Sequence, residues 1–301
     1  MWTMRQALWC LIGSTLVTFL LSLAGWCIWR NIRHHHLRDP RYRLQAIVQT
    51  GPEKEALKTA YLAQQLGLSV DRPLSLYAFN LKKGCERLLA SPLIAKASLK
   101  AIFPATLYVD YEVRKPCAYL QDYENIALDR EGYLFPVSPF FSPKELPEIY
   151  LGLPPFGSPP DRWGRAGGEW NRPLRNAHFQ LAMDLLSYLE KVQWKEGLKI
   201  QRIDVSNAFH ESLGIREVVL FTEETLWIQS QGQEVVCTFP KILRLSPKDY
   251  AHQIDHFLAL KKGMVDGYRR QIAQSPDVKV GQFAPRIIDL RIPQLAFIEN
   301  Q

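Results

Sequence analysis

The chain has 301 residues, 47% of them hydrophobic, which is enough for two modest domains with their own cores in addition to an anchor. Its net charge is +7, but residues 1–43 hold six arginines against one aspartate, so residues 44–301 carry only +2. Because this excess borders one apolar segment, and no basic helix or aromatic-interleaved basic patch stands out elsewhere, the charge does not indicate a nucleic-acid-binding protein.

An uncharged segment, Ala7–Trp29, follows a short N-terminal tail. A helix of 23 residues crosses a hydrocarbon core of about 30 Å at about 1.5 Å per residue. Trp9 lies near one end and Trp26 near the other, where interfacial aromatic residues are expected. A cleaved signal peptide is the alternative, because Ser22-Leu23-Ala24 offers small residues for cleavage, but the apolar run continues past it. The pattern favours an uncleaved transmembrane helix over 7–29, between a tail of residues 1–6 and a basic juxtamembrane segment over 30–42.

Charge alone does not decide how this helix is oriented. The arginines that follow it favour the cytoplasm for their side, yet long domains are translocated largely regardless of charge. Within the helix, Ser14, Thr18 and Ser22 recur every four residues and share one face. Either this face packs against a partner helix, or each hydroxyl bonds a carbonyl of its own preceding turn.

Residues 43–116 are predicted to form a compact α+β domain. We expect a strand over 43–48, a helix over 53–66 that ends at Gly67, and a second helix from the N-cap Asn80 to about residue 90. An antiparallel hairpin follows and turns at Phe103-Pro104-Ala105. Its second strand has the clearest pattern in the chain, because apolar residues alternate with mostly charged ones: Leu107, Val109, Tyr111 and Val113.

Residues 117–301 are predicted to form a second, mixed antiparallel β domain with flanking helices. Strand is expected between Tyr119 and Phe135 with a turn at 129–132, followed by a Pro/Gly-rich loop at about 152–173. A helix over 176–190 has a periodic apolar face of Phe179, Ala182, Leu185, Leu186 and Leu189. Ser246-Pro247-Lys248-Asp249 is expected to start a helix to about residue 261. Further strands are expected at 199–206, 215–221, 225–229, 234–239, 286–292 and 295–298.

Several short motifs occur in an order that resembles the FtsQ/DivIB family of bacterial cell-division proteins. Each motif is weak alone, but together with the N-terminal anchor their order covers nearly the whole chain. They are Phe103-Pro104-x-x-Leu107, Arg114-Lys115-Pro116-x-Ala118, Asp129-x-x-Gly132, Leu146-Pro147-Glu148-Ile149 and, near the end, Ile288-Asp289-Leu290-Arg291, which is similar to the family's terminal VDLR strand. Leu245-Ser246 departs from the Leu-Gly that is usual before the second-domain helix.

The resemblance implies a single-pass protein of the cytoplasmic membrane, with a cytoplasmic N-terminus and the bulk of the chain outside the cytoplasm. It implies a POTRA domain of order β-α-α-β-β over 43–116 and a β domain over 117–301. It implies no catalysis and no cofactor. The implied role is a scaffold for septum formation, which links FtsB-like and FtsL-like partners to the septal peptidoglycan synthesis machinery.

The resemblance also implies that an edge strand near the C-terminus pairs with a strand of a partner. An exposed edge offers unpaired N–H and C=O groups, so main-chain bonds give affinity and alternate side chains give specificity. The alternative is that Ile288 and Leu290 are core residues of a paired strand. The candidate contact residues are Arg286, Ile288, Asp289, Leu290, Arg291 and Ile292.

Sequence motifs for catalysis or metal binding do not occur. There is no Walker loop, GxGxxG or GxSxG. His252 and His256 are four residues apart on a predicted helix, but Gln253 stands where the zinc protease motif needs glutamate. His34-His35-His36 is expected to belong to a polar collar at the membrane rather than to a metal site.

The remaining expectations concern thiols, ligands and alternative classes. Three cysteines, Cys85, Cys117 and Cys237, lie outside the predicted transmembrane helix. Because three is an odd number, at least one of them is free or in an intermolecular pair, and buried free thiols are expected. We expect contact with membrane lipids, but no nucleic acid and no small-molecule substrate. The alternatives to a scaffold are a membrane-anchored, extracytoplasmic cell-wall enzyme and a POTRA-bearing secretion or assembly component.

Overall fold

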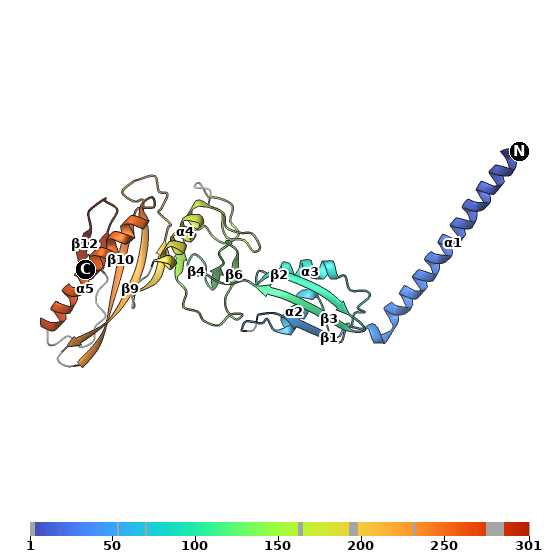
Figure 1. Cartoon of the computed structure of the whole chain (residues 1–301), viewed down its shortest axis with the longest axis horizontal. Helices are drawn as coiled ribbons and strands as arrows, with labels where there is room; N and C mark the ends of the chain where they lie inside the picture. Colours follow the sequence, from blue (N-terminus) through green and yellow to red (C-terminus); the bar gives the residue numbers. More distant parts are fainter. Residues whose placement is uncertain are drawn as a thin grey trace. The chain divides into compact units, whose positions relative to one another are not determined.

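The computed structural model describes residues 4–52, 54–69, 71–161, 165–192, 198–230, 233–274 and 286–300. The protein combines helices with two β-sheets, so the α+β class predicted from the sequence is confirmed. The chain divides into two compact units, here called the first unit, which ends at Val113, and the second unit, which begins at Arg114 (Figure 1).

A long helix, α1 (Met4–Arg38), opens the first unit. Within the described ranges it is the one helix that is long and apolar enough to cross a membrane, over Gly13–Arg38. Side chains over 13–35 are exposed, so this apolar surface is not covered by the rest of the described chain. The helix contains the segment predicted to span the membrane and continues through the first part of the basic segment expected at 30–42.

The rest of the first unit is a three-stranded sheet with two helices. Strand β3 is central, with β1 parallel on one side and β2 antiparallel on the other. Helix α2 contacts β1 and α3, and α3 contacts β2. The strand–helix–helix–strand–strand order is the one expected from the sequence. After the 3-10 turn η1 (Pro40–Tyr42), the elements are β1 (Ala46–Thr50), α2 (Thr59–Leu66), α3 (Leu81–Leu89), β2 (Ile94–Ile102) and β3 (Thr106–Val113).

Local sequence signals explain most of these elements. The four apolar residues of β3, from Leu107 to Val113, are all buried, as the period of two predicts. Asn80 caps α3, because its side chain accepts a hydrogen bond from the Lys83 N–H at 2.9 Å. Gly67 ends α2 with φ +71°, a left-handed conformation that glycine adopts readily.

Helix α2 begins later than predicted, at Thr59 rather than near residue 53, which itself lies outside the described residues. The Leu57 N–H donates to the Tyr111 hydroxyl at 2.8 Å, so this stretch of backbone is bonded to the sheet instead of to a helical turn. Leu57 is buried as a result. The helix therefore starts only after this bond to the sheet, at Thr59.

A nine-stranded mixed sheet forms the second unit. Its strands lie in the order β12-β11-β10-β9-β8-β7-β4-β5-β6, so the chain's last strand occupies one edge. Pairs β7/β8, β4/β7 and β10/β11 are parallel, and the others are antiparallel. The strands are β4 (Ala118–Leu120), β5 (Ile126–Leu128), β6 (Leu134–Pro136), β7 (Glu148–Tyr150), β8 (Leu198–Asp204), β9 (Val218–Ser230), β10 (Gln233–Leu245), β11 (Arg286–Asp289) and β12 (Phe297–Asn300).

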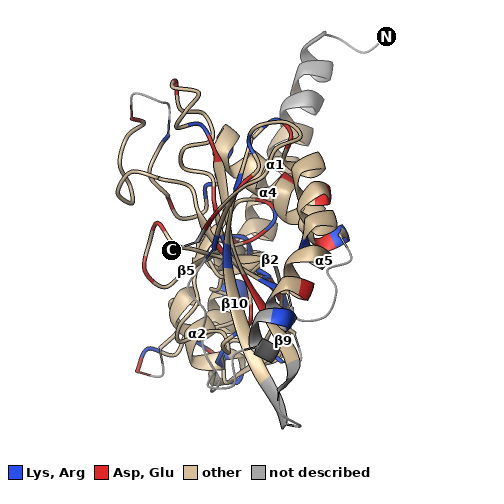
Figure 2. Cartoon of the chain, turned by 90° about the vertical axis from the view of Figure 1, so that its left-hand side faces the viewer, with Lys and Arg blue, Asp and Glu red and all other residues tan. Residues whose placement is uncertain are grey.

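Two helices, α4 (Ala177–Lys191) and α5 (Tyr250–Gln274), pack on this sheet around one hydrophobic core. The periodic apolar face predicted for α4, from Phe179 to Leu189, is buried in that core. Helix α5 contributes Ile254 and Phe257. Charged residues of both signs occur along the described part of α5, as Figure 2 shows.

Several predicted boundaries in the second unit are wrong, and α5 extends to Gln274 instead of ending near residue 261. The strands expected at 215–221 and 225–229 form the single strand β9, and Thr222 and Glu224, which lie between them, are buried in it. Ser246 does not open a helix; α5 begins at Tyr250, and the Ser246 N–H donates to Gln253 Oε1 at 2.7 Å. The strands expected at 225–229 and 234–239 were predicted to be joined across Gln231-Gly232, and these two residues lie outside the described ones.

Two of the sequence motifs meet at the start of the second unit. Arg114 Nη1 lies 2.9 Å from Asp129 Oδ2, both side chains are buried, and the guanidinium lies 3.7 Å from the centre of the Tyr133 ring. Asp129 Oδ1 also accepts the N–H groups of Glu131 and Tyr133. Alternation along β3 suggested an exposed Arg114, so its burial is a finding of the structure. The pair links the Arg-Lys-Pro motif to the Asp-x-x-Gly turn.

Candidate functional site

Strand β12 forms one edge of the nine-stranded sheet. It pairs with β11 antiparallel, with Ile298 opposite Ile288 and Phe297 opposite Asp289, and no described strand pairs with its other side. Phe297 is 66% exposed and Ile298 is 41% exposed. An exposed edge strand with apolar side chains is a template for pairing with a further strand.

The opposite edge of the sheet differs from β12. Strand β6 has three residues, and Leu134 and Phe135 are fully buried. A short, covered strand is one of the usual ways in which a protein protects a sheet edge. Of the two edges, β12 is therefore the one that carries exposed apolar residues.

The structure corrects where the edge lies. Strand β11, which contains the predicted contact residues Arg286, Ile288 and Asp289, pairs with β10 on one side and β12 on the other, so it is an inner strand. Ile288 and Leu290 are buried in the core, as the alternative interpretation held. They are buried because the long strand β10 and the helices α4 and α5 complete the core around them.

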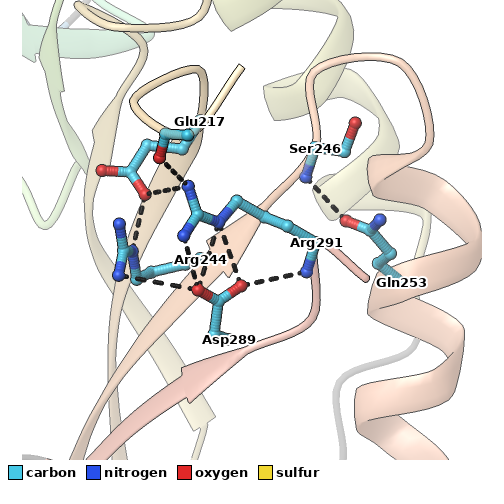
Figure 3. Close-up of polar contacts among 7 residues, drawn as sticks. Glu217, Arg244, Ser246, Gln253, Asp289 and Arg291 are labelled. Carbon is cyan, nitrogen blue, oxygen red and sulfur yellow. Dashed lines mark hydrogen bonds and ion pairs between the residues drawn. The ribbon is translucent and has the colours of Figure 1, made fainter. Parts of the chain in front are cut away.

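Two polar members of the predicted set, Asp289 and Arg291, lie in an ion network beside the edge (Figure 3). Arg291 Nε lies 3.0 Å and 3.1 Å from the two Asp289 carboxylate oxygens, and Arg291 Nη1 lies 3.3 Å from Glu217 Oε2. Arg244 of β10 joins the network, with Nε 2.6 Å from Glu217 and Nη1 3.5 Å from Asp289. The network ties β9, β10 and β11 together and holds the segment after β11 in place.

Asp289 remains ionised in this network. Burial alone would raise its pKa, but hydrogen bonds from Arg291 and the charges of Arg291 and Arg244 outweigh burial and hold the pKa below the ordinary value. A lowered carboxyl pKa stabilises the fold above the unfolded pKa, and this contribution is lost as the pH falls through the folded pKa. At neutral pH the ionised Asp289 therefore makes its full contribution to the stability of the strands next to β12.

A cavity of about 420 Å³ adjoins this network. Basic side chains outnumber acidic ones in its wall, since Arg216, Lys248 and Arg291 face one carboxylate, Asp289. Arg216 donates to the backbone carbonyls of His210 and Glu211, which fixes its position. Of the predicted contact residues, Arg291 and Ile292 also line the cavity, and Ile292 is 62% exposed. The cavity is suited to an anionic group beside the edge.

The hydroxyl stripe of α1 forms bonds within its own helix. Thr18 Oγ1 donates to the Ser14 carbonyl at 2.7 Å, and Ser22 Oγ donates to the Thr18 carbonyl at 2.8 Å. This is the local bonding that the sequence left open as one alternative. Packing of Ser14, Thr18 and Ser22 against a partner helix stays a prediction.

No metal or thiol site emerges from the described side chains. Within them, no group of three or more His, Cys, Asp or Glu residues is arranged to hold a metal ion, and the cysteines there, Cys27, Cys85, Cys117 and Cys237, are not disulfide-bonded. Burial is the main cause that raises the pKa of Cys117 to about 11, so this thiol is a poor nucleophile.

Sequence reasoning missed one buried charge cluster under α5, here called the lysine–glutamate cluster. Lys241 of β10, Glu224 of β9 and Lys261 of α5 form it, and Glu224 pairs with both lysines. Lys241 and Glu224 are almost completely buried. The period of two along β9 and β10 places Glu224 and Lys241 on the sheet face that the helices cover. This periodicity was the one sequence feature from which their burial could have been predicted.

Comparison with known proteins identifies no relative. No family model matches the chain, and no curated protein matches it.

Proposed function

We propose that this chain is a membrane-anchored, non-enzymatic scaffold of the FtsQ/DivIB type, which acts in the bacterial divisome and captures a partner by strand addition at β12. The observation that carries the proposal is the edge itself: β12 ends the nine-stranded sheet and exposes Phe297 and Ile298. We infer the family from the order of the sequence motifs, which resembles that of FtsQ/DivIB proteins. The length and composition of α1 support the anchor.

Strand addition suits this edge for a physical reason. A partner strand pairs its N–H and C=O groups with those of β12, while alternate side chains of the partner contact Phe297 or the opposite face. The ion network holds the inner strands before the partner arrives, so little ordering of the sheet is needed on binding. An acidic side chain beside the added strand could pair with Arg216 or Lys248 in the basic cavity.

We assign the partners and the first unit from the same resemblance. The β-α-α-β-β order, with β3 central between β1 and β2, supports a POTRA-like domain that assists recruitment. The partners proposed for β12 are FtsB-like and FtsL-like division proteins, through which the chain reaches the septal peptidoglycan synthesis machinery. Arg286, Asp289 and Arg291 then act mainly by positioning the edge.

The proposed topology places the N-terminus in the cytoplasm and both units outside it. An alkaline phosphatase fused to the C-terminus is expected to be active, because the second unit reaches the oxidising side of the membrane where this enzyme folds. A fluorescent protein that folds only in the cytoplasm, fused at the same point, serves as the reciprocal reporter. Fluorescence without phosphatase activity would reverse the proposed orientation.

A charge placed on β12 is expected to abolish partner capture. The full chain is purified from membranes with its bound proteins, and Phe297→Lys should lower the yield of the main partner by about tenfold or more, since lysine on an edge disfavours strand pairing. Trp227→Lys is the matched control, because Trp227 is a 64% exposed aromatic residue on β9, which β10 and β11 separate from β12. Equal recovery from both variants would rule out docking at β12, and recovery of no division protein from the unmodified chain would remove the proposed role.

A further inference from the structure

The end of the first unit next to α1 carries a group of apolar side chains, here called the junction patch. It consists of Leu74, Tyr77, Ile102 and Phe103, which are exposed, and Tyr42, which is half-buried. Phe103 is 54% exposed and Ile102 is 48% exposed. Backbone bonds hold its parts together, because the Leu44 N–H donates to the Leu74 carbonyl and the Gln45 N–H donates to the Ala105 carbonyl. Turn 103–105 and loop 74–77 therefore flank the chain as it leaves α1.

Aromatic contacts join this patch to the last turns of α1. The His36 ring stacks on Tyr77 with centroids 4.9 Å apart, and Tyr42 packs edge-on against Tyr77 at the same distance. Phe103 lies 5.0 Å from Tyr77. The patch thus has a fixed relation to the end of the helix that would span the membrane.

The patch also lies close to the membrane if α1 spans it. His36 follows Trp29 by seven residues, which at about 1.5 Å per residue is about 10 Å along the helix. A headgroup layer is about 5–8 Å thick on each side of the hydrocarbon core. The remaining distance of about 2–5 Å is shorter than an extended arginine or phenylalanine side chain, so the patch lies within reach of the headgroup layer.

The charges around the patch are predominantly positive. The segment from Arg30 to Arg43 has five arginines against Asp39, which accepts the Arg41 N–H at 2.9 Å. Arg30 and Arg33 lie over the rings of Trp26 and Trp29 at 5.3 Å and 5.2 Å, an arrangement suited to the membrane interface. Basic residues beside a membrane span attract anionic lipid headgroups.

We propose that the junction patch docks on the membrane surface and binds anionic phospholipid, with Phe103 and Ile102 inserted among the headgroups and the arginines paired with lipid phosphate. This rests on the membrane anchor of the proposed function. The membrane is the occupant because α1 keeps it beside the patch at all times, and because the arginines complement its charge. Docking would hold the first unit against the bilayer instead of letting it turn freely about the end of α1.

The test uses the full chain in nanodiscs of zwitterionic lipid, with or without phosphatidylglycerol. A fluorescent amino acid is introduced at position 103, and lipids that carry bromine near the headgroup end of the acyl chain serve as the quencher. The matched control is the same probe at Leu89, which is 41% exposed and lies near the start of β2, whereas Phe103 follows its end. Nine residues of strand separate the two ends by about 30 Å.

We expect strong quenching at 103 with phosphatidylglycerol, at least twofold weaker quenching without it, and none at 89. Replacing Arg38, Arg41 and Arg43 by glutamine should reduce the quenching at 103 to the level of the zwitterionic disc. If the native tryptophans are quenched but the probe at 103 is not, the membrane anchor is retained and docking of the junction patch is ruled out. Equal quenching at 103 and 89 would also overturn it, and a chain that fails to enter the discs would overturn both the docking and the anchor.

Discussion

Replacing Glu224 by alanine is expected to lower the free energy of unfolding of the second unit by about 3–5 kcal/mol, because it leaves two lysines buried without their counter-charge. Lys241 and Lys261 both pair with this carboxylate, Lys261 at 2.7 Å, and Lys241 is completely buried. Burial lowers the pKa of Lys241, and pairing with Glu224 opposes this shift. Chemical denaturation with hydrogen-exchange readout of β9, β10 and α5 measures the loss.

Two controls separate charge burial from a general effect of the substitution. Glu145→Ala removes a carboxylate of the same type whose pair with Lys199 is exposed, and it should change stability by no more than about 0.5 kcal/mol. A triple variant, Glu224→Leu with Lys241→Met and Lys261→Met, should recover most of the lost stability, because a packed apolar group can replace a buried ion cluster. A Glu224→Ala loss as small as that of Glu145→Ala would mean that the cluster is hydrated in solution.

Val109→Asp is expected to unfold the sheet of the first unit. Val109 is fully buried on the central strand β3, opposite Gln49 of β1 and Leu99 of β2. An unpaired carboxylate at this position costs several kcal/mol, which is most of the stability of a domain of this size. Hydrogen exchange should show loss of protection in β1, β2 and β3, with the strands of the second unit as an internal reference.

The same substitution at an exposed site provides the comparison. Val48 lies on β1 and is 47% exposed, so Val48→Asp should leave the protection of β3 within experimental error of the unmodified chain. If Val109→Asp also left β1 to β3 protected, the apolar face of β3 would not be the core of this unit.

Sequence patterns predicted the local elements well where one face of an element is buried. The alternation of β3 and the apolar face of α4 are confirmed, and the asparagine cap of α3 lies where the pattern puts it. These signals are local, because a period of two or 3.6 residues and a capping side chain are visible within one stretch of chain. The hairpin turn at Phe103-Pro104 is confirmed for the same reason.

The errors come from contacts between distant parts of the chain. The order of strands in a sheet depends on such contacts. The sequence of residues 286–292 does not show that β11 lies between β10 and β12. The buried charge cluster around Glu224 was missed because its two lysine partners are 17 and 37 residues away in the sequence. The alternation of β3 predicted an exposed Arg114, because its buried partner Asp129 lies on a turn 15 residues further along the chain. The edge at β12 could be recognised only after the neighbours of β11 were known.

Site-specific photo-crosslinking in living cells tests the central claim most directly. A photoreactive amino acid is placed at Phe297 and at Glu299 on the edge strand. The control position is Trp227 of β9, which β10 and β11 separate from β12. Docking by strand addition predicts that 297 and 299 both crosslink to the same membrane protein of the division machinery, and that 227 does not. Adducts from 227 alone, or none from either position of β12 while the partner still copurifies, would contradict it.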